Sequence, residues 1–142
     1  AGSAIIMTIM KVRKVIETSI YSRDLEPLKK FYSDVLGFEV IEEEKNKLVF
    51  LKAGASMLLA FNPDRTFPSN DKLPPHGAHG STHFALEIEA SDYEKWKECL
   101  AQNGIAIELE VNWKEARSLY FRDPAGNLVE LMTPGGWPVD HY

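Results

Sequence analysis

The order of predicted elements repeats along this 142-residue chain, and the repeat narrows the choice of fold more than any single motif does. Each half predicts a strand, a helix that ends at a glycine, and three short strands. Glu17 and His83, near the start of the two first strands, are 66 positions apart, and the glycines Gly37 and Gly104 are 67 apart. We therefore predict a duplicated βαβββ unit; the alternative is two unrelated runs of similar order.

The predicted elements follow from periodicity and from start and stop signals. A good N-cap, Asp24, opens the first helix, and a capping box, Ser91 to Glu94, opens the second. Strands are predicted over 13–21, 38–42, 47–51, 56–61, 80–89, 105–111, 117–121 and 127–132. Two such units side by side predict an α+β fold with an open, cup-shaped mixed β-sheet and the helices on its outside.

The length predicts one domain, residues 11–135, composed of module one (11–62), a connecting loop (63–79) and module two (80–135). The loop is rich in proline and glycine, and loops of this length are usually functional or link subdomains. Residues 1–10 are set apart as an N-terminal extension whose first three residues resemble an expression scar. Residues 136–142 form a C-terminal tail.

Composition excludes several classes of function. The net charge is −5 and no lysine or arginine cluster occurs, which argues against nucleic acid or an anionic membrane as partner. No apolar run reaches the length of about 18 residues that a membrane span needs. Cys99 is the only cysteine, so neither an internal disulfide nor a cysteine zinc site is expected, which fits a cytoplasmic location.

The strand that contains His83 has two distinct faces. Phe84, Leu86 and Ile88 alternate with His83 and its neighbours, so the apolar set packs under a helix while His83 faces a wetter, concave surface. A histidine that only completes hydrogen bonds in the core is the alternative. Glu17 holds the equivalent place in the first half.

Glu130 is the third candidate, because it is a carboxylate within an apolar strand and a buried charge needs a partner. Glu17, His83 and Glu130 are therefore predicted to bind one divalent cation and to leave positions for water and substrate. This donor set suits Mn, Zn, Ni, Co or Fe(II). In the last strand of the first half, Leu58 or Ala60 is expected to face inward and cannot coordinate.

Two segments carry a family resemblance. Leu25 to Phe38 resembles the first-helix signature of the vicinal oxygen chelate superfamily, the glyoxalase, bleomycin-resistance and dioxygenase group. Tyr120 to Leu131 resembles its closing signature, and Gly80 to Ala85 matches between them. The loop and the segment after Trp113 resemble a branch of small, mostly uncharacterised bacterial members.

The resemblance implies a homodimeric enzyme that uses a divalent metal as a lyase, isomerase, transferase or dioxygenase on a small oxygen-bearing substrate. It places His83 and Glu130 on metal-ligand positions and Glu17 where many members have histidine. Glu17 is also the expected general base, and the hydroxyls of Tyr21 and Tyr120 are expected to orient the substrate. The alternative function is metal-free binding or sequestration of a drug, as in bleomycin resistance.

Five further residues have a structural role as a ready alternative to a functional one. His76 and His79 are expected to be exposed or to pack within the loop. Arg117 and Arg122 are expected either to bind an anionic substrate or to lie on the surface, and Trp113 to wall the pocket or a subunit contact.

Overall fold

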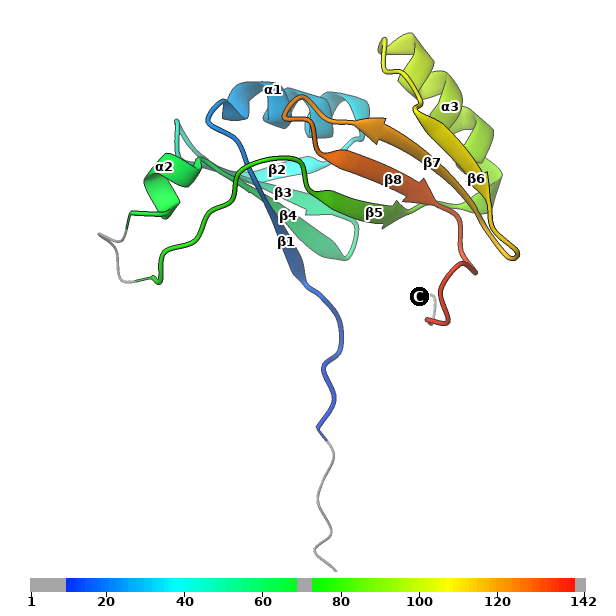
Figure 1. Cartoon of the computed structure of the whole chain (residues 1–142), viewed down its shortest axis with the longest axis horizontal. Coiled ribbons are helices and arrows are strands. Elements are labelled where there is room, and N and C mark those ends of the chain that lie inside the picture. The colour runs from blue at the N-terminus through cyan, green and yellow to red at the C-terminus, as the bar shows by residue number, and fades with distance from the viewer. Residues whose placement is uncertain (1–9, 69–72, 140–142) are drawn as a thin grey trace, which may run out of the picture.

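A computed structural model describes residues 10–68 and 73–139, and within them the chain forms two four-stranded mixed sheets (Figure 1). The first sheet has the order β1-β4-β3-β2 and the second β5-β8-β7-β6. Their strands are β1 Glu17–Tyr21, β2 Glu39–Glu44, β3 Leu48–Ala53, β4 Ser56–Phe61, β5 His83–Glu87, β6 Leu109–Asn112, β7 Arg117–Arg122 and β8 Leu128–Met132.

The two sheets have the same topology, which confirms the predicted fold class. In each, the first strand lies at an edge and pairs in parallel with the last strand, whereas the remaining pairs are antiparallel. The repeated helix–glycine junction has the same backbone conformation, since Gly37 and Gly104 have φ of +74° and +71°. Glycine adopts these angles without the steric cost that a Cβ would impose.

The helices differ from expectation in detail. The first consists of α1 Leu25–Lys30 and a π-helical segment, η1 Phe31–Val35. The second begins as a 3₁₀ turn, η2 Ala90–Asp92, and continues as α3 Tyr93–Gln102. The predicted capping box at Ser91 is wrong: Ser91 lies inside the 3₁₀ turn, and Asp92 caps α3 without a side-chain hydrogen bond. A short helix, α2 Pro63–Thr66, begins the connecting loop and was not predicted.

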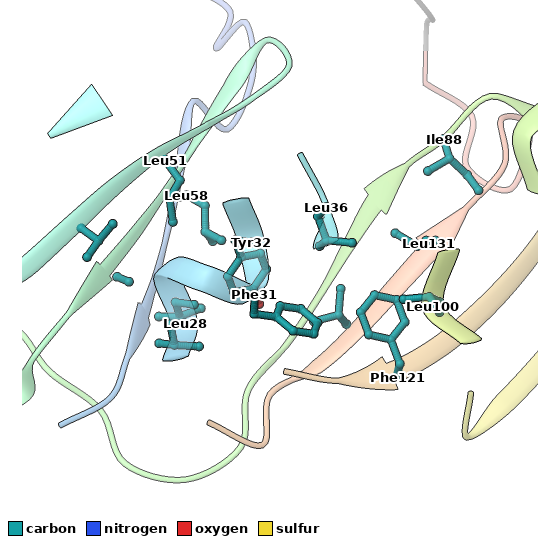
Figure 2. Close-up of a cluster of buried hydrophobic side chains, with 14 of the residues drawn as sticks. Leu28, Phe31, Tyr32, Leu36, Leu51, Leu58, Ile88, Leu100, Phe121 and Leu131 are labelled. Carbon is teal, nitrogen blue, oxygen red and sulfur yellow. The ribbon is translucent and has the colours of Figure 1, made fainter. Parts of the chain in front are cut away.

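The first helix lies between the two sheets and joins them into one core (Figure 2). On one side it packs against Leu51 and Leu58 of the first sheet, and on the other against Phe121 and Leu131 of the second. The rings of Phe31 and Phe121 are 6.0 Å apart. Burial of large apolar side chains on both sides of one helix makes the two modules interdependent.

A buried hydrogen bond also links the modules. The hydroxyl of Tyr32 donates to Asp123 Oδ2 at 2.7 Å, and Asp123 accepts further bonds from the backbone N–H groups of Ala125 and Asn127. The first-helix signature and the closing signature are therefore in direct contact. No helix in the described ranges has both the length and the apolar character needed to cross a membrane.

Candidate functional site

His83 and Glu130 lie on adjacent strands of the second sheet and face the same side. Ala85 of β5 pairs with Glu130 of β8, so His83, two residues earlier, projects from the same face. Its Nε2 atom is 3.3 Å from Glu130 Oε1. The structure thus brings two of the three predicted ligands together.

The Glu130 carboxylate is buried and held in one orientation. Its side chain is 6% exposed. The Ser118 hydroxyl donates to Glu130 Oε2 at 2.5 Å, and the indole Nε1–H of Trp113 donates to Ser118 Oγ at 2.8 Å. Because Oε2 is engaged by Ser118, Oε1 remains directed at His83.

The imidazole of His83 is oriented by the backbone. Its Nδ1 lies 2.9 Å from the carbonyl oxygen of Leu128, and a carbonyl only accepts, so Nδ1 carries a proton. In the neutral ring, Nε2 then presents a lone pair to the carboxylate of Glu130. Two lone pairs at this distance repel unless a proton on Nε2 or a cation lies between them. A metal held by both the histidine and the carboxylate would remove this repulsion.

Tyr120 flanks this pair. It pairs with Glu130 across β7 and β8, and its ring stacks on His83 with centroids 6.1 Å apart. Burial raises the pKa of the Tyr120 hydroxyl, and the nearby Glu130 carboxylate raises it further. The hydroxyl is therefore a neutral hydrogen-bond donor at physiological pH.

Glu17 does not join this group. It is exposed at the start of β1, on the first sheet, whereas His83 and Glu130 lie on the second. Among residues 10–68 and 73–139, no three His, Cys, Asp or Glu side chains are close enough together to hold a metal ion. The expectation that one chain gathers all three ligands is not met, because the sheets flank the first helix instead of closing around a common hollow (Figure 1).

The inward residues of β4 were predicted one position out of register. Leu58 and Ala60 are buried in the core at 3% and 0% exposure. Glu17 pairs with Met57, Ser19 with Leu59 and Tyr21 with Phe61, so these are the residues that share the face of Glu17. By the same pairing in the second sheet, Leu59 is the counterpart of Glu130. The first module therefore still contributes no second ligand.

An open groove with a volume of about 600 Å³ lies on this face of the first sheet, with Glu17 in its wall. Its floor is apolar and consists of Phe50, Met57, Leu59 and Phe61. The floor is a feature that sequence reasoning missed, because it follows from the register of β4.

His76 closes part of this groove. Its Nδ1 is 2.7 Å from the hydroxyl of Tyr21, and its ring meets Phe61 edge-on at 4.7 Å. Burial raises the pKa of the Tyr21 hydroxyl. Tyr21 and His76 are 55 residues apart, and no sequence pattern connects them. Tyr21 lies on the first sheet and so is not grouped with His83 within one chain.

Arg117 and Arg122, the two candidates for binding an anionic substrate, form ion pairs within the protein. Arg117 lies 3.3 Å from Glu94 and places its guanidinium 3.8 Å from the centre of the Tyr93 ring. Arg122 pairs with Glu108 at 2.9 Å. His79 is exposed, as expected for a loop residue.

Comparison with known proteins matches the chain to one superfamily. The family model of the glyoxalase/bleomycin resistance protein/dioxygenase superfamily matches residues 14–131. A metallothiol transferase FosB of Staphylococcus saprophyticus is 33% identical over 106 residues, 72% of this chain and 65% of that protein. A catechol-2,3-dioxygenase of Bacillus subtilis is 30% identical over 112 residues, 77% of this chain and 37% of that protein.

A solved structure is similar over nearly the whole chain. It is the crystal structure of a lactoylglutathione lyase from Agrobacterium tumefaciens, with a TM-score of 0.86 and 34% identity. The superposition covers 92% of this chain and all (100%) of that one. A coverage this high includes most of both modules.

Proposed function

The chain belongs to the glyoxalase/bleomycin resistance protein/dioxygenase superfamily, and on this basis we propose that it is a divalent-metal-dependent enzyme acting on a small molecule with adjacent oxygen atoms. The single observation that carries the proposal is the His83–Glu130 pair. Its Nε2 and Oε1 atoms are directed at each other at 3.3 Å, and each is held there by a partner on its far side. A divalent cation bound between these two atoms would be stabilised by both of them.

The third ligand in this proposal is Glu17 of a second copy. Glu17 is exposed, and His83 keeps 47% of its side chain exposed, so both are accessible to another chain. The equivalent topology of the two sheets means that a homodimer can set the first sheet of one copy against the second sheet of the other. Two carboxylates and a neutral imidazole balance a divalent charge; Mn, Zn, Ni, Co and Fe(II) all suit them.

The bound metal would act as a Lewis acid on the substrate oxygens. The protein's residues position and transfer protons around that centre. Ser118 keeps the Glu130 carboxylate oriented, and the neutral hydroxyl of Tyr120 donates a hydrogen bond to a substrate oxygen. To act as general base, the Glu17 carboxylate would leave the metal and take a proton from the substrate, and Tyr21 orients the part of the substrate that lies in the groove.

Metal content tests the proposal. We expect protein purified without added metal, or reconstituted with Mn, Zn, Ni, Co or Fe(II) and desalted, to retain about one ion per chain by inductively coupled plasma mass spectrometry. His83→Ala and Glu130→Ala should retain almost none. The matched controls are His79→Ala and Glu108→Ala, which change exposed residues away from the pair and should retain the parent's content. A parent that retains no metal after reconstitution would contradict the proposal.

The second candidate is a metal-free binding protein of the bleomycin-resistance type. The apolar groove favours it, since such a surface holds a flat ligand without any chemistry. The net charge of −5 suits a cationic drug. Tight binding of a planar cation by metal-free protein, with no product formed, would support this function over the enzyme.

A further inference from the structure

The groove on the first sheet has two chemically different ends. Glu17 lies at the start of β1 and lines one end, and His76 lines the other end, where it bonds to Tyr21 at the end of β1. About 13 Å of strand separates Glu17 from Tyr21, at about 3.3 Å per residue. Between these ends the floor is apolar: Phe50, Met57, Leu59 and Phe61. A ligand in the groove therefore needs a polar group at each end and an apolar body between them.

The aromatic rings make the floor suited to a flat body. Phe50 and Phe61 contact each other at a centroid distance of 5.6 Å and an interplanar angle of 75°, and the Tyr21 ring stacks on Phe61 at 6.1 Å. Aromatic surfaces of this kind favour stacked or edge-on contact with a ligand ring.

The end of the groove at His76 offers a hydrogen-bond donor and a cation to a ligand. The His76 backbone N–H donates to the carbonyl of Thr66 at 3.1 Å, and the ring Nδ1 bonds to the Tyr21 hydroxyl, so both the backbone and the ring of His76 are held. When the Tyr21 hydroxyl donates to Nδ1, the neutral ring carries its proton on Nε2. That atom has no partner among residues 10–68 and 73–139. Arg65, next to Thr66, lines the same groove with a cation.

We infer that this groove binds the flat apolar body of the substrate and that His76 and Arg65 select an acidic group at its far end. The inference rests on the proposed function, which places the chelating oxygens at the Glu17 end. The substrate class is then an aromatic acid that carries adjacent oxygens on the side opposite its carboxylate. His76 is a specificity-determining residue in this arrangement.

The test uses two probes of the same shape, 2-naphthoate and 2-naphthalenemethanol, titrated into the metal-free protein by calorimetry or fluorescence. Without metal no chelation takes place, so the measurement reports the groove alone, including the Glu17 carboxylate in its wall. We expect the acid to bind at least about fivefold more tightly than the alcohol, because a charge-assisted hydrogen bond is stronger than a neutral one. His76→Ala and Arg65→Ala should each reduce this preference, whereas His79→Ala should keep it.

The floor is tested by polar substitution. Leu59→Asn should weaken both probes by about tenfold, because the ring would lie on an amide that it cannot satisfy. Ile41→Asn is the matched control, since Ile41 is 51% exposed on β2 and outside the groove. Met57→Gln serves as a second floor variant, and melting curves of all variants verify folding.

Each result decides the inference. Failure of the parent to bind either probe would overturn it, as would unchanged binding by both folded floor variants. Equal affinity for acid and alcohol would overturn the selection of an acidic group. Because the probes are measured without metal, a protein that binds them but holds no metal would contradict the proposed function alone.

Discussion

Glu130 and His83 differ in exposure, and the difference assigns them different tasks at the site. The side chain of Glu130 is 6% exposed and that of His83 is 47% exposed. The carboxylate is therefore fixed before any ion arrives, while the imidazole remains the accessible group. The Ser118 hydroxyl is what fixes it, since it bonds the oxygen that faces away from His83.

Removal of that hydroxyl should weaken metal binding. We expect Ser118→Ala to lower the affinity for Zn²⁺ by about tenfold or more, the usual cost of losing an outer-shell partner of a ligand. Trp113→Phe, which removes only the indole donor to Ser118, should have a smaller effect of the same sign. Titration calorimetry measures both, with Ser56→Ala as the control. Affinity unchanged in Ser118→Ala would show that Glu130 is oriented by other means.

Tyr93 predicts an alkaline loss of stability. Its hydroxyl donates to Glu110 at 2.8 Å, and burial together with this bond raises its pKa from 10.0 to about 12. The folded protein thus keeps a proton that the unfolded chain releases above pH 10.0. The free energy of unfolding should fall as the pH rises from about 10 to 12.

Urea denaturation across this range measures the effect, and Tyr93→Phe is the control. The variant should lose part of the pH dependence. The rest should come from Tyr21, Tyr32 and Tyr120, whose pKa values burial also raises, and from Lys29, whose pKa the Glu43 carboxylate raises. The same slope in parent and variant would contradict the assignment to Tyr93.

Residue-level prediction succeeded where alternation along a strand was enough. The period of two predicted that His83 and Glu130 face the same side of the second sheet, and the structure agrees. The opposite face of β8 is buried, and that of β5 is partly buried. It did not find Trp113 as the donor to Ser118, because Trp113 lies in a bend between strands and no periodicity governs it.

At the scale of elements, the turn between β7 and β8 is held by several hydrogen bonds to one side chain, Asp123. Asp123 accepts from Tyr32, from two backbone N–H groups and from the Asn127 amide. It is 4% exposed, so each of these donors would be left without a partner if it were removed.

Asp123→Ala should therefore destabilise the protein by at least about 2 kcal/mol, the cost of leaving more than one buried donor unsatisfied. Chemical denaturation measures the change in the free energy of unfolding. Asp34→Ala is the matched control, because Asp34 is exposed on η1 and its loss should cost less than about 0.5 kcal/mol. A comparable loss in both variants would contradict a special role for the turn.

The register of β4 shows why element prediction stopped short. The bounds Ser56–Phe61 were predicted correctly, yet the faces were reversed, because every residue from Met57 to Phe61 is apolar. In such a strand composition cannot show which side is buried. Pairing with β1 decides it, and that pairing is a long-range contact.

At the scale of the whole molecule, the open arrangement of the sheets separates Glu17 from its expected partners. If a homodimer completes the site, Glu17→Ala and His83→Ala each remove one contribution to every site. Mixed dimers of the two variants would have one site with both defects and one site with none.

Co-expression of the two variants tests this arrangement. Random pairing makes about half of the dimers mixed, so about a quarter of the parent's metal content should return, whereas each variant alone should hold almost none. Mass spectrometry of metal and sedimentation velocity give the two readouts. A mixture that holds no more metal than its components would place all ligands within one chain or exclude Glu17.

The position of the first helix between the two sheets makes each half of the chain depend on the other. A lone βαβββ unit would leave Phe31 and neighbouring apolar side chains of that helix uncovered on one side. A chain of half this length would need a second copy to shield them, whereas in this protein the other module covers them within one chain. Neither half is therefore expected to keep its fold when it is produced alone.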